Sequence, residues 1–310
     1  MASPSPLISV ALCTWNGARW LRPQLDSILA QQDVALEVIA LDDASSDDTL
    51  AILKEYAARD GRLRVHANAD NMGHLRSFGK CMAMCSGDLI APADQDDIWH
   101  SRKLRTLLDA MGGASLAYCD SRYVDADGRP MGRKVSDDLC MFEGHDALPL
   151  VLQNTVSGHA ALLRRDVLTV ALPLPGHGYH DWWLSLVAAD HGGIVYVDAP
   201  LVDFRRHADA CSAVGRAGSS QPMLSRAQRE ALWFQQRAQM ANYFIQRFDG
   251  SDNRHVRDWV AMLTRLSQGD ATGLMRLCFR DFRNPSKALR AWARFRRKAS
   301  RIARGATTSD

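Results

Sequence analysis

The chain reads LIAPADQDDIW at residues 89–99, and this stretch decides the fold class. An apolar run of strand length ends abruptly in the carboxylates of Asp94, Asp96 and Asp97. Asp94 and Asp96 are spaced by one residue, so both side chains can point to the same side of the chain. Carboxylates crowded at the end of a buried strand are unfavourable unless a cation or hydrogen-bond donors compensate them. The stretch therefore predicts a buried strand that ends at a ligand site.

Similar strand-like runs occur on both sides of this stretch and alternate with helical patterns. With the strand at 89–92, the predicted strands of the first 120 residues span 8–13, 37–41, 63–67 and 116–119. Between them, apolar residues recur three and four positions apart, which predicts helices at 19–30, 47–58, 75–84 and 101–111. Such alternation indicates parallel strands joined by helical crossovers, and hence an α/β sandwich.

Beyond residue 120 the pattern loosens before it resumes. The residues DADG at 125–128 indicate a hairpin turn. A second set of elements follows, with helices near 146–153 and 179–189 and strands near 160–164 and 194–197. After a polar stretch at 210–221, the composition becomes helical towards residue 304. We therefore predict a first domain at 1–210 and an α-helical C-terminal region at 211–310.

The formal net charge of +3 hides an asymmetry. Residues 276–310 hold eleven Arg or Lys against two Asp, a net charge of +9, so the first 275 residues carry −6. An acidic body argues against nucleic acid as a partner, because phosphate binding needs basic surface on the binding domain. Within the basic tail at 276–304, the segment RAWARFRRK at 290–298 alternates aromatic residues with cations, as segments on anionic membrane surfaces do. A solvated tail without a binding role is the alternative.

The sequence also bears on location. Its apolar runs are far shorter than the roughly 20 residues that span a bilayer, so no membrane-spanning helix is expected. The first six residues lack a basic segment followed by an apolar one, which predicts a cytoplasmic chain, peripheral at the inner face of the plasma membrane if the tail binds lipid. The seven cysteines are then expected to be reduced, and Cys81 and Cys85, four apart on a predicted helix, are expected in the core.

In an open sheet, ligands sit beyond the carboxyl ends of the strands. There the chain reads CTWNG at 13–17 and DDASSD at 42–47, besides the acidic stretch quoted above. Neither a Gly-x-Gly-x-x-Gly loop nor a Gly-Lys-Ser/Thr phosphate loop occurs, so a nucleotide would need a different kind of site. A carboxylate such as Asp43 can accept the imide N–H of uracil or thymine, and Asp96 can hold a divalent cation on a diphosphate. The alternatives are a helix cap for Asp47 and a simple turn for the acidic stretch.

These residues, in this order, resemble the family-two glycosyltransferases, which have the A-type glycosyltransferase fold. The resemblance is carried by SVALCTWNG at 9–17, LDDASSD at 41–47 and DQDDIW at 94–99. The Asp-Gln-Asp-Asp-x-Trp form is most similar to the bacterial rhamnosyltransferase branch, which builds surface polysaccharides. The likeness covers roughly residues 7–207 and implies a Rossmann-like α/β/α sandwich, with a nucleotide-binding half at 7–120 and an acceptor half at 121–210.

Carried over residue by residue, the resemblance implies donor and metal positions. Asp43 would contact the base, Asp94 would lie near the ribose, and Asp96 would hold Mg²⁺ or Mn²⁺. His207, in an Arg-x-His element, would complete the metal site or touch the diphosphate; a surface histidine is the alternative. The full set of implied donor-binding residues is Thr14, Trp15, Asn16, Asp42, Asp43, Arg76, Asp94 and Gln95.

The same resemblance implies how a sugar would be transferred. Family-two enzymes invert the anomeric centre, so one general base must deprotonate the acceptor hydroxyl as it attacks. The implied base is Asp181, which precedes an aromatic pair in YHDWW at 179–183; a helix cap is the alternative. Of the two Trp residues, one is expected in the core and one facing the acceptor. The implied acceptor residues are Gly158, His159, His180 and Trp182.

A zinc site built from histidines is also conceivable. Its ligands would be His177, His180 and His207. The oxygen-rich acidic stretch favours a harder cation, so this reading is the weaker one.

Together these features predict an inverting, metal-dependent glycosyltransferase. The donor would be a dTDP- or UDP-sugar, with dTDP-L-rhamnose favoured, and the acceptor a glycan or lipid-linked saccharide of a bacterial surface polysaccharide. A processive synthase is a weaker alternative, because its Gln-x-x-Arg-Trp motif is absent. A nucleotidyltransferase and a non-catalytic nucleotide-sugar-binding protein also stay open, although residues 15–19 make a poor phosphate loop.

Overall fold

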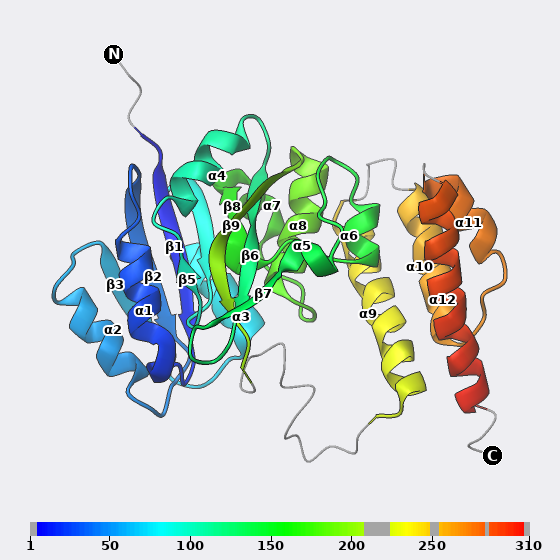
Figure 1. The fold of residues 1–310 in the computed structure, drawn as a ribbon, viewed down its shortest axis with the longest axis horizontal. Helices are drawn as coiled ribbons and strands as arrows, with labels where there is room; N and C mark the ends of the chain where they lie inside the picture. Colours follow the sequence, from blue (N-terminus) through cyan, green and yellow to red (C-terminus); the bar gives the residue numbers. More distant parts are fainter. Residues whose placement is uncertain (1–4, 208–223, 249–253, 283–284, 307–310) are drawn as a thin grey trace. The chain divides into compact units, whose positions relative to one another are not determined.

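The computed structural model describes residues 5–207, 224–248, 254–282 and 285–306, and the chain divides into two compact units, Met1–Ala217 and Gly218–Asp310 (Figure 1). The first unit is built around one large sheet, and the second consists of helices. The domain boundary that the sequence predicts, between residues 210 and 211, lies outside the described residues.

One half of the sheet confirms the predicted alternation of strands and helices. The strands β1 (Leu7–Thr14), β2 (Ala35–Asp42), β3 (Leu63–Ala67) and β4 (Leu89–Ala93) pair in parallel in the order β3-β2-β1-β4. The helices between and after them are α1 (Ala18–Leu29), α2 (Thr49–Ala57), α3 (His74–Met84) and α4 (Lys103–Met111). Nearly every residue of β1 and β4 is buried, so both faces of the sheet are covered there. Cys81 and Cys85 are buried as predicted.

The other half departs from the predicted parallel arrangement. It contains β6 (Leu116–Val124), β8 (Ala161–Arg164), β9 (Ile194–Arg205) and β5 (Ile98–Trp99), and β8 lies between β4 and β6, antiparallel to both. β6 and β9 are parallel, whereas β5 is antiparallel to β9. A short 3-10 helix, η1 (Gly158–Ala160), brings the chain to the carboxyl end of β4. β8 starts from that end and must therefore run backwards along its neighbour.

Several short elements have no clear counterpart in the sequence pattern. They are β5, β7 (Pro130–Lys134), α5 (Val135–Asp138) and α7 (Arg165–Ala171). The hairpin turn at 125–128 joins β6 to β7 as predicted, and α6 (Leu148–Leu152) and α8 (His180–His191) match predicted helices. β9 runs well past its predicted end, and its register on β6 shifts twice. Cys119 pairs with Val197, Asp120 with Pro200 and Ser121 with Val202.

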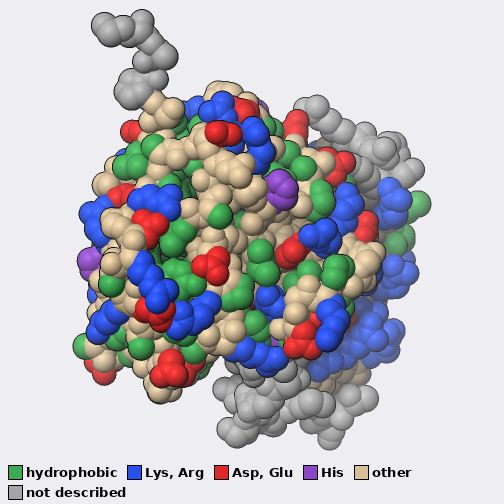
Figure 2. Space-filling model, turned by 60° about the vertical axis from the view of Figure 1, so that its left-hand side comes forward, with side chains coloured by type: hydrophobic (Ala, Val, Ile, Leu, Met, Phe, Trp, Pro, Cys, Tyr) green, Lys and Arg blue, Asp and Glu red, His purple; other side chains and the backbone are tan. Residues whose placement is uncertain are grey.

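The surface of the first unit carries charges of both signs. On the face drawn in Figure 2, its basic and acidic side chains are interspersed, with hydrophobic side chains in small groups between them. Such mixing is typical of a solvated protein surface.

Asp47 caps two helices at once, whereas the sequence predicts capping of one. Its Oδ1 accepts the backbone N–H of Thr49 at the start of α2 (3.0 Å), and its Oδ2 accepts the backbone N–H of Ala18 at the start of α1 (3.1 Å). Helix starts leave backbone N–H groups without partners inside the helix, so one carboxylate stabilises both helices.

Asp47→Ala is expected to lower the free energy of unfolding by about 1–2 kcal/mol, because both helix starts lose an acceptor. Asp48→Ala is the matched control: Asp48 is the N-cap residue of α2, but its side chain makes no capping hydrogen bond. Urea unfolding followed by circular dichroism measures both variants. Equal losses in the two would show that Asp47 does not act as a cap.

The second unit confirms the predicted helical C-terminal region. Its described helices are α9 (Arg226–Arg247), α10 (Arg254–Ser267), α11 (Leu274–Asp281) and α12 (Pro285–Ala306). Ser225 and Gln228 form a capping box at the start of α9. The helices share a buried aromatic core of Phe234, Phe244, Trp259 and Phe295.

One aromatic residue of the basic tail packs inside this unit. Phe295 is 2% exposed and so is not available to a membrane surface, whereas Trp292 is only partly buried. Arg237 and Lys298 lie 3.4 and 3.6 Å from the centroid of the Trp233 ring, where the π electrons attract cations. The exposed cations of residues 290–298 are Arg290, Arg294, Arg296 and Arg297. Among the described helices, none is both long and apolar enough to cross a bilayer.

Candidate active site

The carboxyl ends of β1, β2 and β4 meet at one edge of the sheet, where most of the predicted donor residues lie. The register aligns Thr14 with Asp42 and Leu12 with Ala93. Thr14 Oγ1 donates to Asp42 Oδ1 over 2.9 Å, and both residues are buried. Asp42 Oδ2 also accepts the backbone N–H of Ser45 (2.9 Å). These two buried side chains hold the strand ends together and offer little surface to a ligand.

Asp43 holds the chain segment that follows β3. Its Oδ1 accepts the backbone N–H of Met72 (2.9 Å) and a bond from Asn68 Nδ2 (2.7 Å), and its Oδ2 accepts the backbone N–H of Gly73 (2.9 Å). Burial alone would raise the pKa of this carboxyl, but these hydrogen bonds outweigh burial and hold the pKa below its ordinary value. A nucleotide base at Asp43 would therefore share an oxygen that already accepts a protein N–H.

Gln95 joins the acidic stretch to the loop after β1. Its side-chain amide accepts from the backbone N–H of Trp15 (2.8 Å) and donates to the Trp15 carbonyl (3.0 Å). Asn16 has a left-handed backbone with φ 47°, and its Oδ1 accepts the N–H of Ser46 (2.8 Å). A Cβ at position 17 would collide with the Gln95 amide, which explains Gly17. The loop is thereby fixed, and it presents the Trp15 indole, 54% exposed.

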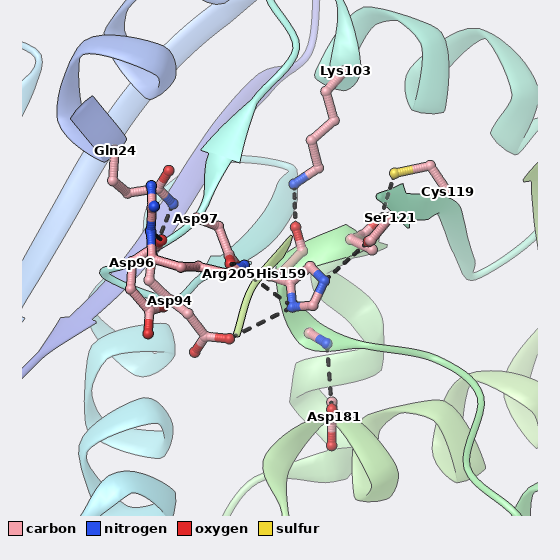
Figure 3. Close-up of polar contacts among 12 residues, drawn as sticks. Gln24, Asp94, Asp96, Asp97, Lys103, Cys119, Ser121, His159, Asp181 and Arg205 are labelled. Carbon is pink, nitrogen blue, oxygen red and sulfur yellow. Dashed lines mark hydrogen bonds and ion pairs between the residues drawn. The ribbon is translucent and has the colours of Figure 1, made fainter. Parts of the chain in front are cut away.

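The acidic stretch is held by groups on neighbouring elements (Figure 3). Gln24 Nε2 donates to the Asp94 carbonyl (2.8 Å), and Arg205 Nε donates to the Asp96 carbonyl (2.8 Å). The backbone N–H of Arg205 donates to Asp97 Oδ1 (3.0 Å). The Asp94 side chain is 34% exposed, whereas that of Asp97 is fully buried. Asp94 is thus the member of this pair that a ligand can reach.

Asp96 and His207, the two predicted metal ligands, come together just beyond the end of β9. Asp96 Oδ2 and His207 Nε2 are 2.7 Å apart, and the His207 ring lies 4.0 Å from that of Trp20, between centroids. Two ligands of one Mg²⁺ or Mn²⁺ are roughly 3 Å apart, so this pair fits a shared cation after a shift of a few tenths of an ångström. A carboxylate oxygen beside an imidazole is also a suitable donor set for Mn²⁺.

A second group of potential ligands lies deeper. Asp94, Asp97 and His159 each offer one ligand atom, and these atoms all lie within 4.8 Å of one another. In the described part of the chain, no other set of three such residues meets this condition. His177, His180 and His207, the ligands of the alternative zinc site, do not meet it. Burial would lower the pKa of His159, but the two carboxylates raise it above its ordinary value. The group therefore suits an imidazole N–H between two acids as well as it suits a metal.

Asp181, the predicted base, lies in the first turn of α8 at the same edge of the sheet. Its Oδ2 accepts the N–H of Gly158 (3.4 Å), and its Oδ1 that of Trp182 (2.6 Å). Burial raises the pKa of Asp181 to about 6, against the opposing charge of His74. The N-cap of α8 is Tyr179 and not Asp181, but Asp181 Oδ1 accepts a first-turn backbone N–H and so also stabilises the start of the helix. A carboxyl whose pKa lies near neutrality is suited to accept a proton.

The predicted acceptor residues lie close to Asp181 but are buried. His159 and His180 are each 3% exposed, and Trp182 is 6% exposed. His180 stacks on Phe78 with 3.8 Å between ring centroids, and burial lowers its pKa to about 3. The neighbouring Trp183 is fully buried too, so the expected split between a packed and an open indole is not seen.

Gly158 and Tyr179 complete this side of the site. A Cβ at Gly158 would collide with the His180 ring, so glycine is required there by packing. Tyr179 is 49% exposed and is the aromatic residue next to Asp181 that a sugar could reach.

The sequence reasoning missed several residues that hold the site. Gln24 and Arg205 fix the acidic stretch, and His74 Nε2 lies 3.9 Å from Asp94 Oδ1. Lys103, the first residue of α4, is fully buried and donates to the His159 carbonyl. Arg205 stood two residues before His207, which was a usable signal, whereas nothing in the sequence marks Lys103 as buried. The predicted diphosphate contact Arg76 is exposed on α3, and its side chain makes no hydrogen bond or ion pair with the described residues.

Solved structures with bound nucleotide sugars share this architecture. S. aureus TarS 1-349 in complex with UDP-GlcNAc aligns over 98% of this chain and 92% of that chain, with a TM-score of 0.59 and 15% identity. The mannosyltransferase PcManGT from Pyrobaculum calidifontis, in complex with GDP-Man and Mn²⁺, aligns over 98% and 87%, with a TM-score of 0.57 and 14% identity. At these identities the likeness shows the fold alone. The class is thereby defined: the chain has the predicted A-type glycosyltransferase fold.

Sequence comparison gives the family. Residues 9–170 match the family model described as Glycosyl transferase family 2. The dTDP-rhamnosyl transferase RfbG of Shigella flexneri is 30% identical over 215 residues, which cover 63% of this chain and 71% of that protein. A Bacillus subtilis (strain 168) protein, provisionally named the teichuronic acid biosynthesis glycosyltransferase TuaG, is 30% identical over 135 residues, 43% of this chain and 54% of its own length. The chain belongs to glycosyl transferase family 2.

The coverage of these relatives is uneven. For TuaG and two other relatives, the matched stretch covers 29% to 54% of the relative's own length. The family match ends at residue 170, before Asp181 and His207. The family model therefore covers the predicted donor half and the first part of the predicted acceptor half, including Gly158 and His159.

Proposed function

We propose that this chain is an inverting glycosyltransferase that moves a sugar from a dTDP- or UDP-linked donor to a saccharide or lipid-linked saccharide in bacterial surface polysaccharide synthesis. The observation that carries the proposal is the carboxyl of Asp181, whose pKa is raised and which lies at the same edge of the sheet as the Asp94–Asp97 stretch (Figure 3). Rhamnose is the favoured sugar, supported by the likeness to a protein named as a dTDP-rhamnosyl transferase.

Asp181 acts as the base in this proposal. Inversion is a single displacement, in which the acceptor hydroxyl attacks the anomeric carbon from the side opposite the diphosphate. Asp181 removes the hydroxyl proton as the new C–O bond forms and the bond to the diphosphate breaks. Its pKa of about 6 leaves the carboxylate ionised at pH 7, yet basic enough to take a proton in the transition state.

The donor is held by the other carboxylates. Asp43 accepts the imide N–H of the base, and Asp94 receives the ribose. Asp96 and His207 would hold Mg²⁺ or Mn²⁺, supported by the convergence of their ligand atoms. When bound, the cation neutralises charge that develops on the departing diphosphate.

A panel of nucleotide sugars tests the proposal. With Mn²⁺ or Mg²⁺ and a lipid-linked saccharide acceptor, the protein is expected to release nucleoside diphosphate fastest from dTDP-L-rhamnose among UDP-, GDP- and dTDP-sugars. EDTA is expected to lower that release by at least about tenfold. Chromatography of the nucleotides provides the measurement, and reactions without acceptor provide the control.

The alternatives give different results in the same assay. A nucleotidyltransferase would release pyrophosphate from a nucleoside triphosphate and a sugar phosphate. A non-catalytic protein would bind a nucleotide sugar without releasing diphosphate. Absence of metal-dependent release from every donor, with the acceptor present, would contradict the proposed function.

A further inference from the structure

His159 connects the core of the first unit to the acidic stretch (Figure 3). It lies in η1, is 3% exposed, and its ring stacks on Phe204 with 4.5 Å between centroids. Its Nε2 meets Ser121 Oγ of β6 at 3.0 Å, and its carbonyl accepts a hydrogen bond from Lys103 Nζ at 2.5 Å. A side chain enclosed in this way has little surface to offer an acceptor sugar, which is the role that the resemblance implies for it.

The remaining ring nitrogen, Nδ1, faces two carboxylates of unequal exposure. It lies 3.5 Å from Asp97 Oδ2 and 3.7 Å from Asp94 Oδ2, distances of an ion pair shared between two acids and longer than a hydrogen bond. Asp97 Oδ2 has no hydrogen-bond partner among the described residues, and Asp97 is fully buried. Asp94 is 34% exposed. The imidazole thus reaches from the core to the carboxylate that a ligand can touch.

Lys103 and Ser121 hold this histidine in one orientation. Lys103 is fully buried, and its ammonium lies 3.1 Å from the centroid of the Trp99 ring. Burial lowers the pKa of Lys103 to about 7, so enclosing this side chain is costly. Because Lys103 fixes the backbone of His159 and Ser121 fixes Nε2, the ring keeps Nδ1 directed between Asp97 and Asp94.

We propose that His159 is a positioning residue for the nucleotide donor: from behind the site, its Nδ1 holds the Asp94 carboxylate in the orientation that receives the donor. The inference rests on the proposed function, in which Asp94 contacts the donor. His159 touches no substrate atom and acts through Asp94. A metal bound directly by Asp94, Asp97 and His159 is the competing arrangement.

Two substitutions of His159 separate orientation from packing. Asn places an amide near the position of Nδ1, whereas Gln places one near that of Nε2. Both variants should bind UDP and dTDP more weakly than the wild type in the presence of Mn²⁺, with His159→Gln weaker than His159→Asn by at least about fivefold. Isothermal titration calorimetry measures these affinities, and the donor KM should change more than kcat. His191→Gln, an exposed position at the far end of α8, is the control and should bind as the wild type does.

The outcomes that overturn the proposal are distinct. Equal losses of affinity in the two variants, with equal falls in melting temperature, would mean that His159 only fills space. Binding of Mn²⁺ to the wild type without nucleotide, lost in both variants, would make His159 a metal ligand. A wild type that binds nucleoside diphosphate but releases none from any nucleotide sugar would contradict the proposed function alone, because the affinity contrast between the variants would still be measurable.

Discussion

Asp181→Asn is expected to lower the rate of sugar transfer by about 10²- to 10⁴-fold, while the affinity for nucleoside diphosphate stays within about threefold of the wild type. The amide cannot take up the acceptor proton, but it keeps the shape of the side chain and one oxygen, which can still accept the N–H of Trp182, while the longer bond from the Gly158 N–H is lost. Diphosphate release at saturating acceptor measures the rate, and calorimetry measures binding. Asp190→Asn, at an exposed position on the same helix, is the control.

The pH dependence of the wild-type rate checks the same base independently. Burial raises the pKa of Asp181 to about 6, and a base must be deprotonated to act. The rate is therefore expected to be flat above pH 7 and to fall about tenfold per pH unit well below pH 6. If Asp181→Asn is as active as the wild type, or if the wild-type rate stays flat down to pH 5, another residue is the base.

The raised pKa of Asp181 also affects how the stability of the protein changes with pH. The folded state binds the Asp181 proton more tightly than the unfolded state, so this contribution to stability is complete below the unfolded pKa and is lost as the pH rises through about 6. Asp181→Asn removes the cost of burying a charge at pH 7.5, which offsets the loss of one acceptor for a backbone N–H. Loss of activity in this variant can then be separated from unfolding.

Asp96→Asn is the second substitution with a large expected effect, a fall in kcat/KM for the donor of about 10²- to 10³-fold together with loss of the response to EDTA. Asp96 Oδ2 lies 2.7 Å from His207 Nε2, and a neutral amide is a poor ligand for a hard cation. Titration of the initial rate with Mn²⁺ measures the effect. Asp127→Asn, an exposed carboxylate in the turn between β6 and β7, is the control.

One result would assign the metal to a different site. If Asp96→Asn keeps its response to Mn²⁺ while Asp97→Asn loses it, the cation belongs to the group of Asp94, Asp97 and His159. The Asp96 and His207 pair would then be a hydrogen bond that shapes the loop.

The donor side of the site could be predicted from the sequence because its residues follow strand ends. Thr14, Asp42, Asp43 and the acidic stretch come directly after apolar runs, and neighbouring parallel strands deliver their carboxyl ends to one edge. No knowledge of distant contacts is needed for that step. The likeness in motif order then supplied roles that spacing alone does not give.

The acceptor side could not be predicted as well, because burial there depends on how separate elements pack. The sequence does not tell whether His180 faces solvent or stacks on Phe78, which lies on a different helix. The antiparallel direction of β8 follows from where η1 stands, and the placement of Arg205 follows from the irregular pairing of β9. These are tertiary outcomes that no local pattern encodes.

The irregular pairing of β9 also decides which of its last side chains serve the site. After the shifts opposite Asp120 and Ser121, pairing is regular from Val202 to Arg205. Side chains alternate along a strand, so Arg205 and His207, two apart, both reach Asp96, whereas Arg206 is exposed. Removal of one residue from the shifted stretch would exchange the two faces and offer Arg206 to the acidic loop. The choice between Arg205 and Arg206 at the acidic stretch therefore depends on the number of residues in the shifted stretch of β9.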